Sequence, residues 1–206
     1  MTLAGCSSSA GTAVGSSAPA KAADRPGTET AGTDTAVAAK GGRLGGAGSA
    51  CELPVTFDLA ARWKPKAIEL EPDSVLAEQG AVKMVCEIDA KPAGNIGFLR
   101  VWRGKTSEDD PQAVLKAFVA DDPNASKAAY TQVKAGALAA AEVGYTVRSE
   151  LMDESKSERA FAVSTPDGPV VVHLGGMDTE EHTAMLPAFE LAKKSLKLGT
   201  VRELAQ

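Results

Sequence analysis

The chain has 206 residues, with 22 lysines and arginines against 27 aspartates and glutamates, and a formal charge of −5 at neutral pH. Its pI of about 5.2 excludes a nucleic-acid-binding surface, which needs concentrated positive charge, and no basic cluster exceeds the pair Lys193-Lys194. The sequence contains no run of 18 apolar residues that could cross a bilayer as a helix.

Residues 1–50 differ in composition from the rest of the chain. They hold no Phe, Trp or Tyr and ten of the 20 glycines, and 37 of the 50 are Gly, Ala, Ser, Thr or Pro. A segment with so little apolar surface to bury cannot offset its conformational entropy, so we predict a disordered tether. All nine aromatic residues fall in 51–206, which we predict to be one globular domain.

The chain starts Met1-Thr2-Leu3-Ala4-Gly5-Cys6 and continues directly into serines. Leu-Ala-Gly-Cys resembles the lipobox of bacterial lipoproteins, in which the cysteine thiol receives a diacylglyceryl group and cleavage makes that cysteine the new N-terminus. The resemblance implies lipidation at Cys6, with palmitate-like acyl chains, on the outer face of the cytoplasmic membrane. Two acyl chains are what stable anchoring requires.

A secretory signal peptide needs a charged segment and 7–15 apolar residues before its cleavage site. The five residues before Cys6 provide neither, so we expect the signal to begin upstream of Met1 or to have been trimmed. The alternative is an ordinary N-terminus with a chance cysteine. As a flexible coil, residues 7–50 would span about 36 Å root-mean-square and hold the domain off the membrane.

Two further cysteines are Cys51, at the start of the predicted domain, and Cys86, inside an alternating apolar run. An even pair in an exported domain predicts a disulfide. A metal site would need more ligands nearby, and a catalytic cysteine would need a histidine partner. A buried free thiol at Cys86 is the competing interpretation.

The first half of the predicted domain carries strand patterns. Apolar residues alternate with polar ones over 55–63 and over 82–89, which predicts two half-buried strands. Prolines and a glycine mark 64–80 as an irregular connection. Turn residues at 91–95 return the chain into 96–103, so this strand forms a hairpin with 82–89, and its apolar residues on both sides predict burial on both faces.

A helix start follows at Asp110-Pro111, with Asp110 as the N-cap and Pro111 at the first helical position, and Pro123 ends that helix. Residues 127–142 are ambiguous by themselves. Their alanines favour a helix, whereas Gly136 and the aromatic and β-branched residues favour strands.

The last third of the chain again alternates clearly. The pattern predicts, in order, a strand at 143–151, a turn at 153–157, a strand through Phe161 and Val163, a turn at 165–168 and a strand at 169–174. A capping-box-like start at Asp178 opens the last helix. Its buried stripe is predicted to be Met185, Phe189, Ala192 and Leu196, with Pro187 kinking or splitting it.

This order of elements predicts an α+β domain, an antiparallel β-sheet with helices packed on it. The element order, Phe57-Asp58-Leu59, Trp63-Lys64 and the 145–174 meander resemble the PsbP-type α/β/α sandwich. More narrowly, the chain resembles actinobacterial cell-envelope lipoproteins of the LpqN type. The resemblance implies strand–turn–strand for 127–142, and a binding or assembly module rather than an enzyme.

Motifs that would carry chemistry are weak. Residues 104–106 read Gly-Lys-Thr like the end of a P-loop, but Leu99 stands where the motif needs glycine and no helix follows directly. His173 is expected to point away from its apolar strand neighbours, and His182 to lie on the exposed face of the first turn of the last helix. We therefore predict no catalytic residue, no metal and no cofactor.

Trp102 and Arg103 provide the remaining candidate surface. Core packing is the default for Trp102, and a partner-facing groove is the functional alternative. The leading hypothesis is a membrane-tethered, non-enzymatic module that binds an unknown envelope protein or small ligand. The alternatives are a small-molecule or lipid carrier with an apolar pocket of about a few hundred Å³, and an extracytoplasmic hydrolase with a site assembled from scattered residues.

Overall fold

The computed structural model describes residues 36–69, 78–105, 110–149 and 154–199, and the structural statements below refer to these residues. Their helices are α1 (Pro111–Ala120) and α2 (Thr179–Ser195), with a 3₁₀ turn η2 (Lys91–Ala93). The strands are β1 (Lys40–Leu44), β2 (Val55–Ala60), β3 (Lys64–Ala67), β4 (Glu78–Gln79), β5 (Val82–Asp89), β6 (Gly97–Arg103), β7 (Ala125–Ala135), β8 (Leu138–Ser149), β9 (Glu154–Val163), β10 (Val170–Gly176) and β11 (Lys197–Leu198).

The strands form two antiparallel sheets. The larger has the order β3-β5-β6-β10-β9-β8-β7, with β4 also pairing with β5, and the smaller has the order β1-β2-β11. All pairings between these strands are antiparallel. With two helices packed on the sheets, the predicted α+β class is confirmed. Neither helix in the described ranges is long and apolar enough to cross a membrane.

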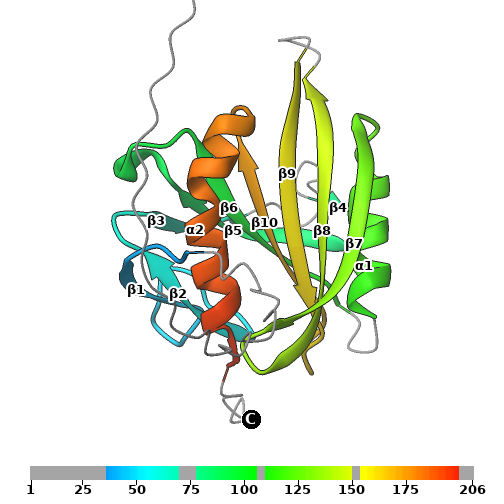
Figure 1. The fold of residues 1–206 in the computed structure, drawn as a ribbon. Helices are drawn as coiled ribbons and strands as arrows, with labels where there is room; N and C mark the ends of the chain where they lie inside the picture. Colours follow the sequence, from blue (N-terminus) through cyan, green and yellow to red (C-terminus); the bar gives the residue numbers. More distant parts are fainter. Residues whose placement is uncertain (1–35, 70–77, 106–109, 150–153, 200–206) are drawn as a thin grey trace, which may run out of the picture. The chain divides into compact units, whose positions relative to one another are not determined.

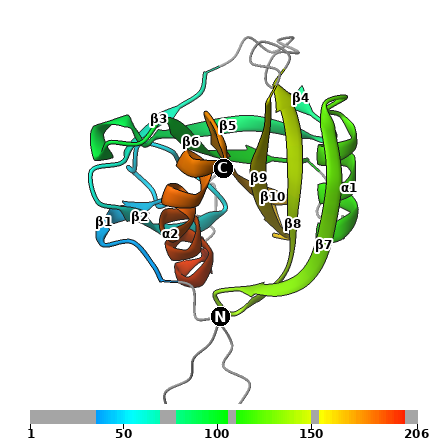
Figure 2. The same cartoon turned by 45° about the horizontal axis from the view of Figure 1, so that its top comes forward.

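The helices cover opposite faces of the larger sheet, as Figures 1 and 2 show. Side chains that alternate along β10 enter two separate cores because neighbouring residues of a strand point to opposite faces. Val172 lies in the core that contains Phe189 of α2 and residues of the small sheet. Val171 lies in the second core with Phe118 of α1. Strand β10 is therefore buried on both faces along its whole length. The burial predicted for both faces of 96–103 holds only in part, because Trp102 is buried on the α1 side whereas Ile96 is 52% exposed and Phe98 is half-buried.

The ambiguous segment 127–142 is part of two long strands, β7 and β8, joined at Gly136. This residue has φ +56°, and a Cβ there would lie 1.9 Å from the carbonyl oxygen of Leu196. Ala140 and Ala141 are both buried, one in each core. The alanines therefore serve close packing on two faces of a strand, and the strand–turn–strand prediction is confirmed.

The predicted disordered tether over residues 1–50 is wrong for its last part. Within the described residues 36–50, β1 pairs with β2, and Leu44 is 1% exposed in the core beneath α2. A Cβ at Gly41 would lie 2.5 Å from the Cα of Ala61, so glycine here permits a close backbone approach. Gly41, which suggests disorder by composition, is instead required by this close approach.

Two further predictions in the connections are corrected. Residues 64–80 include the strands β3 and β4, both paired with β5. Proline is tolerated at Pro65 because β3 is the edge strand of the sheet. The turn predicted at 153–157 is mostly strand, since β9 begins at Glu154.

Helix α2 is not split at Pro187. It runs without interruption from Thr179 to Ser195, and the Pro187 carbonyl accepts a hydrogen bond of 2.9 Å from the amide of Ala38. All four residues of the predicted stripe are buried. The predicted disulfide between Cys51 and Cys86 is present, with Cα atoms 6.0 Å apart, and it ties the segment after β1 to β5.

Candidate functional site

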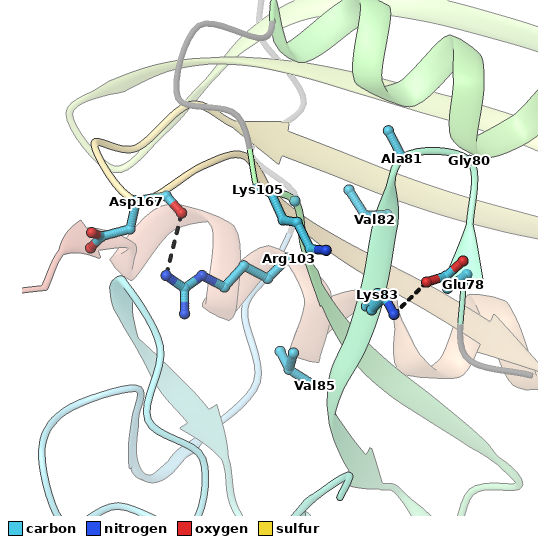
Figure 3. A pocket seen from close by; sticks show the side chains of 10 residues that line it. Glu78, Gly80, Ala81, Val82, Lys83, Val85, Arg103, Lys105 and Asp167 are labelled. Carbon is cyan, nitrogen blue, oxygen red and sulfur yellow. Dashed lines mark hydrogen bonds and ion pairs between the residues drawn. The ribbon is translucent and has the colours of Figure 1, made fainter. Parts of the chain in front are cut away.

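A pocket of about 620 Å³ opens where the ends of β4, β5 and β6 meet the turn before β10 (Figure 3). Six of its ten lining residues are exposed, so the pocket is open to solvent and is not an enclosed cavity. Its lining residues are Glu78, Gly80, Ala81, Val82, Lys83, Val85, Arg103, Gly104, Lys105 and Asp167.

Strand register brings the basic residues of the pocket together. Lys83 on β5 lies directly opposite Arg103 on β6, and Lys105 follows two residues later, just after β6 ends. The turn that carries Asp167 is held against β6, because the amide of Gly104 donates a hydrogen bond of 2.9 Å to the carbonyl of Pro169. The sheet and this turn therefore form two walls of the pocket.

A glycine sets the distance between these walls. Gly168 has φ +106°, and a Cβ there would lie 2.3 Å from the carbonyl oxygen of Gly104. Only a residue without a side chain allows the turn to approach β6 this closely. The turn signal at 165–168 was recognised in the sequence, but its function as a pocket wall requires the pairing of β6 with β10.

The charges of the pocket are only partly neutralised. Lys83 pairs with Glu78 at an Nζ–Oε1 distance of 2.5 Å. The Arg103 guanidinium donates a hydrogen bond of 3.3 Å to the main-chain carbonyl of Asp167, and this carbonyl is a neutral acceptor. Within the part of the chain that the structure describes, neither Arg103 nor Lys105 forms an ion pair with a carboxylate.

The structure separates the two residues of the predicted partner surface. Arg103 is exposed and lines the pocket. Trp102 is 6% exposed and packs edge-on against Phe118 of α1, with ring centroids 5.3 Å apart. Successive residues of a strand point to opposite faces, so the two side chains cannot share one surface. Trp102 as part of a partner surface is therefore wrong, and its core packing is confirmed.

Sequence reasoning missed a buried polar network on the α1 side of the sheet. The Glu158 Oε2 atom lies 2.8 Å from His173 Nε2 and 3.1 Å from the Tyr145 hydroxyl, and Lys156 Nζ lies 2.8 Å from Glu158 Oε1. These residues come from three adjacent strands, β8, β9 and β10. The sequence signal for it is His173, a histidine within the otherwise apolar strand β10, whereas Glu158 stands in the polar half of β9 and gives no such signal.

This network stabilises a charged carboxylate inside the protein. Burial alone would raise the pKa of Glu158, but the charges and hydrogen bonds of His173 and Lys156 outweigh it and lower the pKa to about 2. Burial, and then the Glu158 charge, raise the pKa of Tyr145. Because Glu158 is 8% exposed and Tyr145 and His173 are also buried, a substrate has no access to the carboxylate of this network.

His182 is buried, which corrects its predicted exposed position. It is 4% exposed on the first turns of α2, and its Nδ1 atom has no hydrogen-bond partner. Burial, followed by the nearby charge of Arg159, lowers the pKa of His182 to about 4. Lys156 and His173 act in the same direction and Glu158 opposes them. The neutral imidazole is thus the form that fits the folded state.

Acid should therefore destabilise the protein through His182. Its folded-state pKa lies below the ordinary value of 6.5, so its stabilisation is complete above pH 6.5 and is lost as the pH falls towards 4. When the pH falls from 6.5 to 4.5, the unfolding free energy of the wild type should drop by about 2–3 kcal/mol more than that of His182→Gln. Urea unfolding across this range measures it. The range avoids Glu158, whose contribution is lost only below pH 4.5. Parallel pH profiles of the two proteins would contradict the prediction.

Comparison with known proteins gives a family and a distant structural likeness. A family model described as an uncharacterised lipoprotein matches residues 21–196. No curated protein matches the chain. A similar solved structure is that of LpqN, described as involved in cell envelope biogenesis of Mycobacterium tuberculosis. Its identity is 14% and its TM-score 0.36, and the alignment covers 66% of this chain and 84% of that one.

The lipidation site predicted at Cys6 lies outside the described residues and also outside the matched range. The match nevertheless covers most of the chain and both cores of the fold, from residue 21 to the end of α2. It confirms the prediction of a lipoprotein, a class that is associated with a membrane. The chain belongs to this family of uncharacterised lipoproteins.

Proposed function

We propose that the protein is a lipid-anchored component of the cell envelope whose folded domain binds a small ligand or an envelope protein without catalysing a reaction. The observation that carries the proposal is the open pocket, whose basic residues are only partly neutralised. Exposed charges that the fold does not pair are available to a binding partner. The domain would bind at this pocket while the anchor keeps it at the outer face of the cytoplasmic membrane.

Anchoring at Cys6 is supported by the Leu-Ala-Gly-Cys sequence and by membership of a lipoprotein family. A non-enzymatic role is supported by the burial of the Tyr145–Glu158–His173 network. This group has the residue types of an acid–base site, but a catalytic base must come within hydrogen-bond distance of its substrate. The pocket, by contrast, is lined by charged and small residues without a histidine or cysteine.

Both parts of the proposal can be tested in intact cells with the full chain and its native signal. A photo-crosslinking residue at Ala81, which is exposed in the pocket, should form an adduct of defined mass. The same residue at Lys64, exposed on β3 and outside the pocket lining, is the matched control. Cys6→Ser should release the protein from the detergent phase.

The outcomes separate the two parts. Equal crosslinking from Ala81 and Lys64 would reject the pocket as the binding site, and unchanged membrane partitioning of Cys6→Ser would reject the anchor. Turnover of a substrate by the purified domain, abolished by Arg103→Gln, would reject the non-enzymatic role.

A further inference from the structure

The geometry of the pocket points to a more specific ligand: we propose that Arg103 and Lys105 bind a phosphate group carried by an organic molecule. This inference rests on the proposed function, because it names the chemical class that the pocket takes. The phosphate belongs either to a soluble metabolite or to a lipid whose headgroup is a phosphate monoester, since both present the same oxyanion to the pocket.

The first argument is a like-charge pair across two strands. Lys83 and Arg103 are directly opposite in the register of β5 and β6, an arrangement that destabilises a sheet when nothing compensates it. Glu78, on the neighbouring strand β4, neutralises Lys83 from the far side. Across these three strands, Glu78 pairs with Lys83, and Arg103 is left without a carboxylate partner among the described residues. Lys105 is a second cation without such a partner.

The second argument is the state of the Arg103 side chain. Its Nη2 atom donates to the Asp167 carbonyl at 3.3 Å, which directs the guanidinium towards the turn before β10 (Figure 3). A guanidinium carries five N–H donors in a rigid fork that matches an oxyanion. One weak bond to a neutral oxygen orients this fork and leaves further donors available for a ligand.

The third argument is the balance of charge. A phosphate monoester carries about −1.5 to −2 at neutral pH. Glu78 offsets Lys83, and Arg103 and Lys105 outnumber the remaining carboxylate of the lining, Asp167, so the pocket keeps a net positive charge that attracts a doubly charged phosphate more strongly than a carboxylate. The protein as a whole carries −5, so long-range attraction does not favour anions elsewhere on its surface. Local pairing at these two residues is what would select the ligand.

The fourth argument is size. At about 620 Å³ the pocket falls within the range for drug-sized ligands and is much larger than a phosphate ion. Val85, which is partly buried, provides apolar surface beside the cations. An organic group attached to the phosphate would cover this side chain, which explains why we infer a phosphate ester rather than inorganic phosphate as the ligand.

The test is a titration of the full chain with Cys6→Ser, which removes acylation, followed by NMR of the backbone amides. Glycerol 3-phosphate should shift the amides of residues 81–83 and 103–105 saturably, and acetate should bind more weakly. Arg103→Gln with Lys105→Gln should weaken binding by about tenfold or more, as expected for lost charged hydrogen bonds. Lys64→Gln, an exposed lysine on β3, is the matched control and should leave binding unchanged.

Vesicles identify the source of the phosphate. Sedimentation with phosphatidic acid but not phosphatidylcholine vesicles, lost in the double variant, would assign a lipid headgroup. Binding of glycerol 3-phosphate alone would assign a soluble ester. Equal binding by wild type and double variant would overturn the proposal, as would the absence of saturable shifts up to about 10 mM together with no vesicle binding. Site-specific crosslinking from Ala81 would in that case still support the pocket as a binding site for another partner.

Discussion

Removal of the disulfide between Cys51 and Cys86 should lower the free energy of unfolding by about 4 kcal/mol. The two cysteines are 35 residues apart, and the chain-entropy model gives a stabilisation of about this size for a loop of that length. Both are buried, and the bond joins the segment between β1 and β2 to the middle of β5. Without it, the small sheet would be connected to the large sheet by non-covalent packing alone in this region.

The measurement is urea unfolding of Cys51→Ala with Cys86→Ala against the oxidised wild type. Cys6→Ala is the matched control, since its thiol takes no part in this bond, and should leave the midpoint unchanged. Two free thiols at Cys51 and Cys86 in protein purified from its native envelope would contradict the prediction. Such a result would also weaken the case for an exported domain.

A chain that begins at Ala50 should be less stable than one that begins at Thr35 by about 3–5 kcal/mol. The shorter chain lacks β1, which pairs with β2, and it lacks the Leu44 side chain in the core beneath α2. Losing a buried leucine side chain typically costs about 2–5 kcal/mol, and the exposed edge of β2 adds to this loss. Composition alone predicts no difference between the two chains.

Point variants separate the side chain from the strand. Leu44→Ala should account for about 2–4 kcal/mol of the loss. Arg43→Ala, one residue earlier, removes a surface ion pair with Asp58 and should change stability by about 1 kcal/mol or less. Coincident urea curves for the chains that begin at Thr35 and Ala50 would show that β1 does not contribute to the core.

Elements with local signals were predicted from the sequence. The Asp110 side chain accepts a hydrogen bond from the Ala113 amide, and Asp178 does the same for Glu181, as expected of N-caps. The hairpin of β5 and β6 and the turn at 165–168 were predicted in the same way. Each of these features depends on a few neighbouring residues, whose conformational preferences act over one or two turns of chain.

The errors have a common cause in contacts between distant residues. Composition does not reveal β1, because its two glycines become part of a strand only when β2 is beside them. His182 lies three residues before Met185, on the same face of α2 as the predicted stripe, and only tertiary packing shows that this face is also covered in the first turns. Trp102 and Arg103 were grouped by adjacency, although the second core under α1 takes only the tryptophan.

The α+β class, the caps and turns, the disulfide pair and the lipoprotein resemblance follow from the amino-acid sequence, because all of these depend on local pattern or on residue type. Where the functional groups meet follows from tertiary contacts. Antiparallel register places Lys83 opposite Arg103, and the pairing of β10 with β6 brings Asp167 beside them. Strand pairing likewise assembles Tyr145, Glu158 and His173 from three strands into one buried network. Register depends on which strands become neighbours, and that choice is made by the burial of whole faces rather than by any single segment.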